Sequence, residues 1–421
     1  MSLNFAPRGP STSLGLTYRA RTVVTMDGPP IDDGAVAVAG DRIAAVGRFE
    51  EIRALGGPVI DLGEVIILPG LINAHCHLDF TSLRGGIRPR RSFADWILQI
   101  NRLRRDLSDE DFLVSIALGF AEARRWGTTT IANIESMPAL LERMAPPPLR
   151  TWWFAELIDV RPGLSAEEMI EDSLSFLLNK ESWPGSVGLS PHAPYTASPR
   201  LTRLAAETAN RHKMLLTTHL AESSEEMEMF RHGRGRLFEL LESLGRSMDD
   251  CGAGKTPLAV MLEREAINDR WIVVHLNELA EEDLVRLESG PRFHIAHCPR
   301  SSRYFQHRPF AMQELRELRF NICLGTDSLA SNSSLSLFAE MQTVRDAHRW
   351  LEPERILEMV TSNSARALDQ KDVLGKIRPG FQADLIALPI ENGRRDIFEK
   401  IIAWSEPVPW MLVAGVPRPL A

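Results

Sequence analysis

Eight short apolar runs, separated by stretches with helical periodicity, are the feature that most restricts the fold of this 421-residue chain. Parallel strands need crossover connections, usually helices, so the alternation is typical of a parallel sheet covered by helices. Eight such strands predict an α/β fold, a (β/α)8 TIM-like barrel with its chemistry at the carboxyl ends of the strands. The expected strands are Val65 to His77, Thr128 to Ile134, Thr151 to Ile158, Ser186 to Ser190, Leu215 to Leu220, Trp271 to Leu276, Phe293 to His297 and Asn321 to Thr326.

Shorter strand-like runs flank this segment at both ends of the chain. Residues 15–64 alternate apolar runs with Gly- and Asp-containing turns, and β character returns at residues 380–388 and 410–414. We expect the tail to complete the sheet that the N-terminal segment begins, giving a small β-sandwich domain made by both terminal segments. The predicted domains are residues 15–68 and 371–421 for the small domain, and residues 69–370 for the barrel.

Charge and cysteine content narrow the class of function. The net charge of the chain is −8, whereas proteins that bind a nucleic-acid polymer or an anionic membrane usually carry an excess of basic residues. We therefore expect a small-molecule substrate. The N-terminal segment does not resemble a leader for export, and the sequence contains no apolar run of 18 residues. We therefore expect neither export nor membrane spanning. The four cysteines lie far apart along the sequence, which favours a reducing compartment, so we expect a cytoplasmic protein. The sequence is also compatible with a homo-oligomer.

The carboxyl ends of the expected strands carry an uncommon set of polar residues. His75 and His77 lie two apart on one strand, so their side chains point to the same side and can share a metal ion. A single strand-end histidine is usually a half-buried structural residue. Six of the eight expected strands end in a candidate ligand or acid–base group, and a barrel brings those ends together. The other strand-end residues are His192, His219, His275, His297 and Asp327.

Five segments resemble the amidohydrolase superfamily, specifically its deaminase and chlorohydrolase branch. They are residues 69–77, 190–196, 219–223, 297–302 and 325–332. The resemblance implies that His75, His77, His219 and Asp327 bind one divalent metal ion, with zinc expected and iron, manganese or nickel as alternatives. Such a ligand set leaves a position for water, whose pKa a bound ion lowers to about 7. Relatives with two metals carry a carboxylated lysine at the end of the fourth strand, and residues 187–190 contain none.

The resemblance also implies a set of catalytic groups. Glu222 would protonate a ring nitrogen, Asp327 would accept the proton of the water, and His275 would hold or polarise the attacking hydroxide. The implied reaction is hydrolytic deamination of an aminated heteroaromatic ring, with ammonia released after attack by metal-bound hydroxide. The alternative interpretations are that Glu222 is the first acid of a surface helix and that His275 bonds to the backbone.

Substrate selection rests on fewer residues. His192 resembles a substrate-contacting position, and residues 84–97 follow the histidine pair at a distance that suits a lid, in which Asp95 or Trp96 would meet a ribose or a ring. Arg300 and the arginines of the lid suit a carboxylate, so we expect an adenine nucleoside derivative such as aminodeoxyfutalosine, ahead of S-adenosylhomocysteine and methylthioadenosine. A deaminase of guanine, 8-oxoguanine or a pterin, or a chlorohydrolase, remains open. A non-catalytic binding or scaffold barrel is the alternative of another class.

Overall fold

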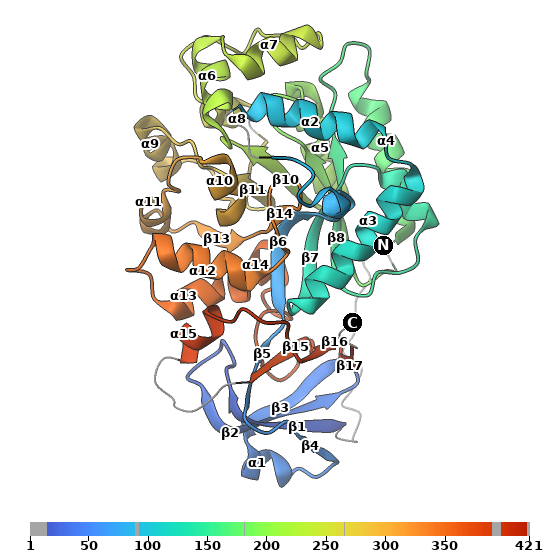
Figure 1. Cartoon of the computed structure of the whole chain (residues 1–421), viewed down its shortest axis with the longest axis vertical. Helices are drawn as coiled ribbons and strands as arrows, with labels where there is room; N and C mark the ends of the chain where they lie inside the picture. The colour runs from blue at the N-terminus through green and yellow to red at the C-terminus, as the bar shows by residue number, and fades with distance from the viewer. Residues whose placement is uncertain (1–14, 89–91, 181, 265, 390–396, 419–421) are drawn as a thin grey trace.

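The computed structural model describes residues 15–88, 92–180, 182–264, 266–389 and 397–418 (Figure 1). In Figure 1 a sheet surrounded by helices forms the upper part of the molecule, and a smaller sheet lies below it. The strands of the upper sheet are β6 (Leu71–His77), β7 (Thr128–Glu135), β8 (Arg150–Leu157), β9 (Gly185–Pro191), β10 (Leu215–Leu220), β11 (Trp271–His275), β12 (His294–His297), β13 (Asn321–Leu324) and β14 (Asp327–Ser328).

The upper sheet is parallel and curls on itself. Within the described residues its strand order is β13-β12-β11-β10-β9-β8-β7-β6-β14. Because β14 follows β13 along the chain and pairs with β6, with Asp327 opposite Cys76, the first and last strands of the sheet meet. This arrangement is the TIM-like barrel that the eight runs predict, and β10 begins and ends at the predicted residues.

The eighth expected strand is split, and the split closes the barrel. The amide of Gly325 donates to the carbonyl of His297 at 2.9 Å, and the amide of Thr326 donates to the carbonyl of His75 at 3.0 Å. A Cβ atom on Gly325 would lie 2.7 Å from the His75 carbonyl oxygen, so this close approach requires glycine. The segment between β13 and β14 therefore joins β12 to β6 and delivers Asp327 beside the histidine pair.

The first expected strand is also two strands. The run 65–77 breaks at Gly70, because the amide of Gly70 donates to the carbonyl of Asp384 at 2.9 Å, whereas the next amide, that of Leu71, donates to the carbonyl of Gly127 at 3.0 Å. A Cβ on Gly70 would lie 2.2 Å from the side chain of Thr129, so this position requires glycine. Residues 65–69 form β5, which pairs with the terminal strands instead of leading the histidine pair through the barrel. The prediction of one continuous strand was therefore wrong at this point, since apolar periodicity alone does not reveal a change of sheet.

Both terminal segments contribute to the small sheet, as expected from the sequence. Its order is β17-β16-β15-β5-β1-β2-β3, with β4 on β1. The described pairings connect all eight strands into one sheet, which supports a small β unit without defining the two sheets of a sandwich. The strands are β1 (Leu16–Val23), β2 (Ile31–Ala39), β3 (Arg42–Arg48), β4 (Val59–Asp61), β5 (Val65–Pro69), β15 (Leu385–Pro389), β16 (Trp410–Val413) and β17 (Val416–Pro417).

Helices cover the outside of the barrel, apart from α1, which packs against the small sheet. They are α1 (Phe49–Arg53), α2 (Phe93–Arg105), α3 (Asp109–Arg125), α4 (Ala166–Leu177), α5 (Pro199–His212), α6 (Ser224–His232), α7 (Arg236–Ser243), α8 (Pro257–Glu263), α9 (Glu281–Ser289), α10 (Pro299–Phe305), α11 (Met312–Glu317), α12 (Leu337–Ala347), α13 (Pro353–Glu358), α14 (Ser362–Ala367) and α15 (Ile397–Ile402). Short 3₁₀ helices occupy Leu78–Leu83, Pro138–Arg143 and Leu178–Lys180. In the part of the chain described, no helix is long and apolar enough to cross a membrane.

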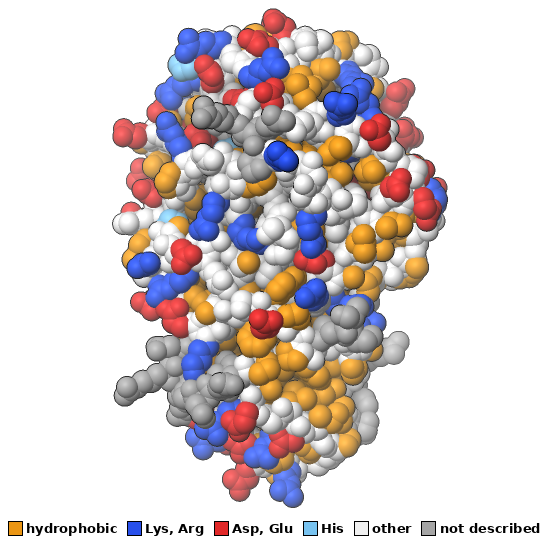
Figure 2. Space-filling model, viewed as in Figure 1, with side chains coloured by type: hydrophobic (Ala, Val, Ile, Leu, Met, Phe, Trp, Pro, Cys, Tyr) orange, Lys and Arg blue, Asp and Glu red, His pale blue; other side chains and the backbone are white. Residues whose placement is uncertain are grey.

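The alternation of side chains along β8 divides the apolar core into two layers. Trp153 packs in the large cluster that includes Phe120 of α3, whereas Trp152 and Phe154 pack in a second cluster. Because successive strand residues face opposite sides, one layer joins the sheet to its helices and the other lies on the opposite face. On the surface, Figure 2 shows hydrophobic side chains gathered over the small sheet and charged ones spread over the barrel.

Candidate active site

Five polar side chains meet at the carboxyl end of the barrel. His75 and His77 end β6, His219 lies near the end of β10, His275 ends β11, and Asp327 begins β14. All five residues are buried. The sequence predicted this convergence, because the carboxyl ends of parallel barrel strands share one rim.

The nitrogens of three of these histidines face one another. The ligand atoms of His75, His77 and His219 all lie within 4.8 Å of each other, and the two Nε2 atoms of His77 and His219 are 3.4 Å apart. Oδ1 of Asp327 lies 3.6 Å from Nε2 of His75 and 3.8 Å from Nε2 of His77. Both ring nitrogens of His75 are buried without a hydrogen-bond partner among the described residues. Buried polar atoms are normally satisfied, so this donor set fits a bound metal ion.

Neighbouring groups orient these ligands. Nδ1 of His219 lies 2.9 Å from the carbonyl of His192, a contact in which the imidazole donates and its Nε2 keeps a free lone pair. Oδ2 of Asp327 accepts hydrogen bonds from the hydroxyls of Ser301 at 2.6 Å and Ser331 at 3.1 Å. The backbone of Asp327 is left-handed, with φ of 57°. A conformation this uncommon for a non-glycine residue is often found where function requires it.

Burial sets the charge of the histidines. It lowers the pKa of His219 to about 3 and that of His77 well below its ordinary value, with the nearby histidines adding to the effect. Burial alone would raise the pKa of Asp327, but the contact of its carboxylate with His75 at 3.6 Å and the surrounding imidazoles hold that pKa well below the ordinary value. Neutral imidazole and ionised carboxylate are the forms that bind metals.

Glu222 lies beside this cluster on a strained turn. Its Oε1 is 3.5 Å from Nε2 of His275, and these two residues form a second close group with Asp327. The carboxylate of Glu226 holds the turn by accepting the amides of Ala221 at 3.1 Å and Glu222 at 2.7 Å. Burial raises the pKa of Glu222 well above its ordinary value, and the charge of Asp327 adds to this. Glu222 is therefore a buried acid at the site and not the first residue of a surface helix.

A cavity of about 800 Å³ opens onto these groups. His77, His219, His275, Glu222 and Asp327 line one end of it. Its remaining wall is largely apolar and comes from α2, α7 and the loop after β8. These residues include Trp96, Ile97, Val160, Leu164, Leu237, Leu240, Leu241 and Leu244. The size of the cavity is in the range of sites that enclose small organic molecules.

The residues predicted to contact substrate divide into two groups. His192 and Trp96 line the cavity, but Asp95 and Arg300 are not among its described lining residues. Asp95 forms an exposed ion pair with Arg236 at 3.2 Å. The guanidinium of Arg300 bonds to Ser333 and Ser334 and lies 3.9 Å from the carboxylate of Glu340.

Two further predictions have different outcomes. The strand-end residue His297 stacks on Phe310, with ring centroids 4.1 Å apart, and lies away from the described cavity wall. Of the lid arginines, Arg84 pairs with Glu122, whereas Arg90 and Arg91 lie outside the described residues.

The structure adds cavity residues that the sequence did not indicate. Glu156 at the end of β8 and Arg104 of α2 both line the cavity. In the sequence, Glu156 follows an apolar run and Arg104 lies in a helix rich in basic residues, so neither position carries a distinguishing pattern. Only the position of Glu156 as the penultimate residue of a barrel strand could have marked it.

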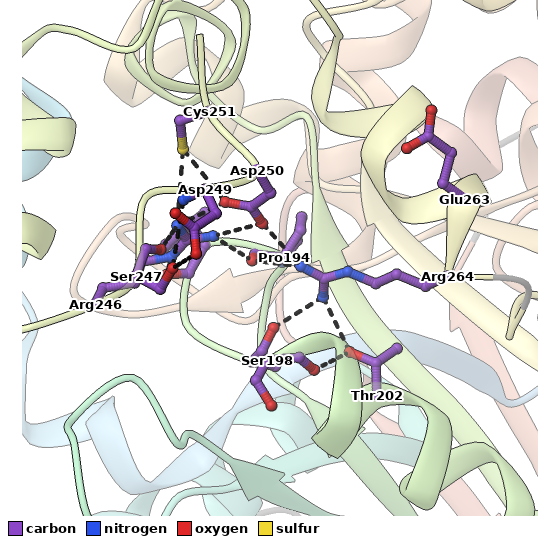
Figure 3. Close-up of polar contacts among 12 residues, drawn as sticks. Pro194, Ser198, Thr202, Arg246, Ser247, Asp249, Asp250, Cys251, Glu263 and Arg264 are labelled. Atoms are coloured by element: carbon purple, nitrogen blue, oxygen red, sulfur yellow. Dashed lines mark hydrogen bonds and ion pairs between the residues drawn. The ribbon is translucent and has the colours of Figure 1, made fainter. Parts of the chain in front are cut away.

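A set of buried ionic contacts supports the turn that follows His192 (Figure 3). Arg264 donates to the carbonyls of Pro194 at 2.9 Å and Ala197 at 2.8 Å, and Arg246 donates to that of Tyr195 at 2.9 Å. Asp250 accepts from Arg246 at 2.8 Å and lies 3.6 Å from Arg264. We call Arg246, Asp250 and Arg264 the brace. Because the 194–197 turn also carries Thr196, which bonds to the His192 ring at 2.6 Å, the brace fixes one wall of the cavity.

The fold and this site define a class of protein. Residues 66–403 match the model of the amidohydrolase family, and the chain belongs to that family. Residues 34–55 also match an imidazolonepropionase-like composite domain of bacteria. Within the family, the chain lies in the branch of deaminases and chlorohydrolases, as the sequence motifs predicted.

Curated relatives align with most of the chain. A 5-methylthioadenosine/S-adenosylhomocysteine deaminase of Syntrophobacter fumaroxidans is 31% identical over 378 residues, covering 86% of this chain and 81% of the relative. A protein with the same description from Pyrococcus furiosus is 29% identical and covers 86% and 82% of the two chains.

Solved structures share the fold. An adenosine deaminase from Xanthomonas campestris with bound zinc superimposes with a TM-score of 0.83 at 24% identity, covering 96% of this chain and 92% of its own. Aminofutalosine deaminase from Helicobacter pylori gives a TM-score of 0.81 at 21% identity, covering 96% and 99% of the two chains. At these identities the likeness describes the fold.

Proposed function

We propose that this protein is a metal-dependent hydrolytic deaminase that releases ammonia from an adenine nucleoside derivative. The observation that carries the proposal is the meeting of three histidines, Asp327 and the buried acid Glu222 at one end of the cavity. The names of the aligned relatives, all deaminases of substituted adenosines, support the same reaction.

We propose that His75, His77, His219 and Asp327 hold one divalent ion, with zinc as the metal. The partnerless nitrogens of His75 and the orientation of His219 support this set. No lysine occurs on β9, where a lysine could bridge a second metal, so one ion is the simpler arrangement. When bound, the ion polarises a water molecule and brings its pKa towards about 7.

The chain's own groups then have distinct proton-transfer roles. Glu222, whose pKa burial raises, is suited to carry a proton at neutral pH and to give it to a ring nitrogen of the substrate. Asp327 is suited to accept the proton of the attacking water at its carboxylate. His275 lies between them, 3.5 Å from Glu222, where it can hold the attacking oxygen by a hydrogen bond. After water has added to the amino-bearing carbon, the proton held by Asp327 passes to the amino group, Glu222 takes back the proton of the added hydroxyl, and the bond between carbon and the amino group breaks to release ammonia.

The cavity also bears on the choice of substrate. Arg300, which had suggested a carboxylated substrate such as aminodeoxyfutalosine, bonds to Ser333 and Ser334 instead of lining the cavity. The leucines of α7 give the outer wall an apolar character. These observations favour an adenosine whose distal substituent is at least partly apolar.

Ammonia release tests the proposal directly. Purified, zinc-loaded protein would be given adenosine, substituted adenosines, guanine, 8-oxoguanine, pterins and a chlorinated triazine. Ammonia from one or more adenosines supports the proposal. Chloride release, or ammonia from free bases alone, would overturn it in favour of another member of the branch, and silence across the panel would favour a non-catalytic barrel.

We also propose that residues 69–370 form the catalytic domain and that residues 15–68 and 371–421 form one supporting β-sandwich domain. The passage of the chain from β5 to β6 at Gly70 supports a boundary there. Limited proteolysis followed by mass spectrometry would test it, with first cleavages expected outside 69–370.

A further inference from the structure

Two carboxylates in the cavity wall accept no hydrogen bond from any described residue. One is Glu222, whose Oε1 lies 3.5 Å from Nε2 of His275. The other is Glu156, whose Oε1 lies 3.9 Å from Nε2 of His192, and whose side chain is only 8% exposed. Glu222 has a role in the proposed reaction, whereas Glu156 has none.

Other buried acids nearby each accept at least one hydrogen bond from the protein, although Oδ1 of Asp79 has no partner among the described residues. The carboxylate of Asp79 accepts from the hydroxyl of Ser136, and that of Glu135 accepts from the amide of Met137 at 3.1 Å. Glu226 accepts two backbone amides. A buried carboxylate without donors is costly, so exceptions of this kind occur mainly where a ligand supplies the donors.

The position of Glu156 limits the part of a substrate that it can reach. Glu156 lies opposite Ser190 of β9, one strand away from His192. The His192 ring is next to the ligand His219, with ring centroids 4.8 Å apart. Glu156 is therefore separated from the metal-binding histidines by one side chain, which suits a group attached directly to the reacting ring.

The charges around Glu156 limit the chemistry of that group. The guanidinium of Arg104 lines the same cavity, lies 4.9 Å from the centroid of Phe80 and donates to Ser136 at 3.0 Å, which leaves other N–H groups for a ligand. A substrate carboxylate would meet the charge of Glu156, and a substrate ammonium would meet that of Arg104. Hydroxyl groups can donate to the first and accept from the second.

We propose that Glu156 and Arg104 form a subsite for adjacent hydroxyl groups of the substrate, such as the 2′ and 3′ hydroxyls of a ribose. The subsite rests on the proposed function in that it places the sugar beside the ring that Glu222 protonates. It replaces Asp95, the sequence-based candidate for this contact, whose side chain is held on the surface by Arg236.

The test removes each side of the contact separately. Zinc-loaded wild type, Glu156→Gln and Glu156→Ala would be compared on adenosine and on 2′,3′-dideoxyadenosine, which lacks only the two hydroxyls. We expect kcat/KM on adenosine to fall about 10-fold for the glutamine variant and about 100-fold for the alanine variant, as for loss of hydrogen bonds to a charged group. On the dideoxy compound both variants should stay within threefold of wild type.

An equal loss on both nucleosides would overturn the subsite, because a structural role for Glu156 does not depend on substrate hydroxyls. Glu171→Gln, at an exposed position on α4, is the matched control and should leave both values unchanged. Thermal unfolding of each variant separates misfolding from lost contact.

A second readout separates this proposal from the proposed function. If the wild type releases no ammonia from any adenosine, calorimetric binding of adenosine and of 2′,3′-dideoxyadenosine to wild type and Glu156→Gln still tests the subsite. Weaker binding of adenosine alone by the variant supports it even then. Equal affinities of the two proteins for adenosine would overturn it.

Discussion

The cluster of His75, His77, His219 and Asp327, proposed to bind the metal, and the brace are both polar and lie at the carboxyl end of the barrel, but their polar atoms are paired to different extents. In the cluster, both ring nitrogens of His75 and Nδ1 of His77 lack partners among the described residues. In the brace, the two guanidinium groups donate to the carbonyls of Pro194, Tyr195 and Ala197 and pair with Asp250, and only Nε of Arg264 lacks a partner among the described residues. The difference indicates that a cluster of converging unpaired atoms is suited to bind a ligand, whereas a cluster in which nearly all atoms are paired holds the frame in which it binds.

The largest effect should follow removal of a ligand from the cluster. Asp327→Ala should abolish ammonia release and weaken metal affinity by more than about 100-fold, which exceeds the usual loss for groups that only support ligands. Metal content measured by atomic emission after dialysis checks the second part. Wild-type metal content in the variant would argue against ligation by Asp327 and would weaken the contrast with the brace.

A smaller effect should follow loss of the acid without loss of a ligand. Glu222→Gln should reduce kcat by about 10²- to 10⁴-fold, the usual contribution of a general acid or base, and should leave the metal content unchanged. Steady-state kinetics with the best nucleoside of the panel measures it. If the variant keeps full activity, Glu222 has no proton-transfer role.

A change in the brace should affect stability more than chemistry. Arg264→Met removes the donor of three hydrogen bonds and one of the two arginines that pair with Asp250, so the free energy of unfolding should fall by about 3 kcal/mol. Urea unfolding measures this, with Arg234→Met as the control, since the exposed pair of Arg234 with Glu228 should contribute less than about 1 kcal/mol. Equal stability of the two variants would mean that the brace does not hold the frame.

His294 of the barrel sheet, whose ring is hydrogen-bonded to Asn321, should make the free energy of unfolding depend on pH below neutrality. Asn321 donates from Nδ2 to Nδ1 of His294 at 2.9 Å, and burial, with the charge of Arg366, lowers the pKa of His294 to about 4. In the unfolded chain, the His294 imidazole takes up a proton near pH 6.5, whereas in the folded protein it does so only near pH 4. The contribution of neutral His294 to the free energy of unfolding is therefore complete above pH 6.5 and falls as the pH drops towards 4. Between pH 7 and pH 5, wild type should lose on the order of 1–2 kcal/mol more than His294→Gln in urea unfolding. Parallel losses in the two proteins would exclude this contribution.

The smallest effect should come from Asp95, which belongs to neither cluster. Asp95→Asn removes an exposed ion pair, so kcat/KM should change less than twofold and the free energy of unfolding by less than about 0.5 kcal/mol. A tenfold loss on adenosine, with no change on the dideoxy compound, would return the hydroxyl contact to Asp95.

The sequence predicted that the candidate ligands converge because parallel barrel strands place their carboxyl ends on one rim, whereas their role as metal ligands is implied by the family resemblance and stays a prediction. His75, His219 and Asp327 are far apart along the chain, yet each lies at the end of a parallel strand, and those ends share one rim. The orientation of long side chains was not predictable in the same way. Arg300 follows a strand-end histidine by three residues, but its direction depends on Ser333, Ser334 and Glu340, which no local pattern brings to it.

Glu156 and the break at Gly70 illustrate what else local sequence does not contain. A single acid at the end of an apolar run has the same appearance whether it meets solvent, an ion pair or a ligand. The break depends on which strand each amide reaches, since the amide of Gly70 donates to the carbonyl of Asp384 and that of Leu71 to the carbonyl of Gly127. Both features are set by tertiary packing, which a single sequence without its structure does not specify.

The pairing of β5 with β15 has a consequence for the order in which the protein is made. Ile66 pairs with Leu388, so the partner of β5 on that side leaves the ribosome only after the whole barrel has been synthesised. At about 5–20 residues per second, tens of seconds pass with one edge of β5 open, directly before the strand that carries the histidine pair. An unpaired apolar strand edge can form hydrogen bonds with a strand of another nascent chain, so the C-terminal strands limit aggregation once they pair with β5.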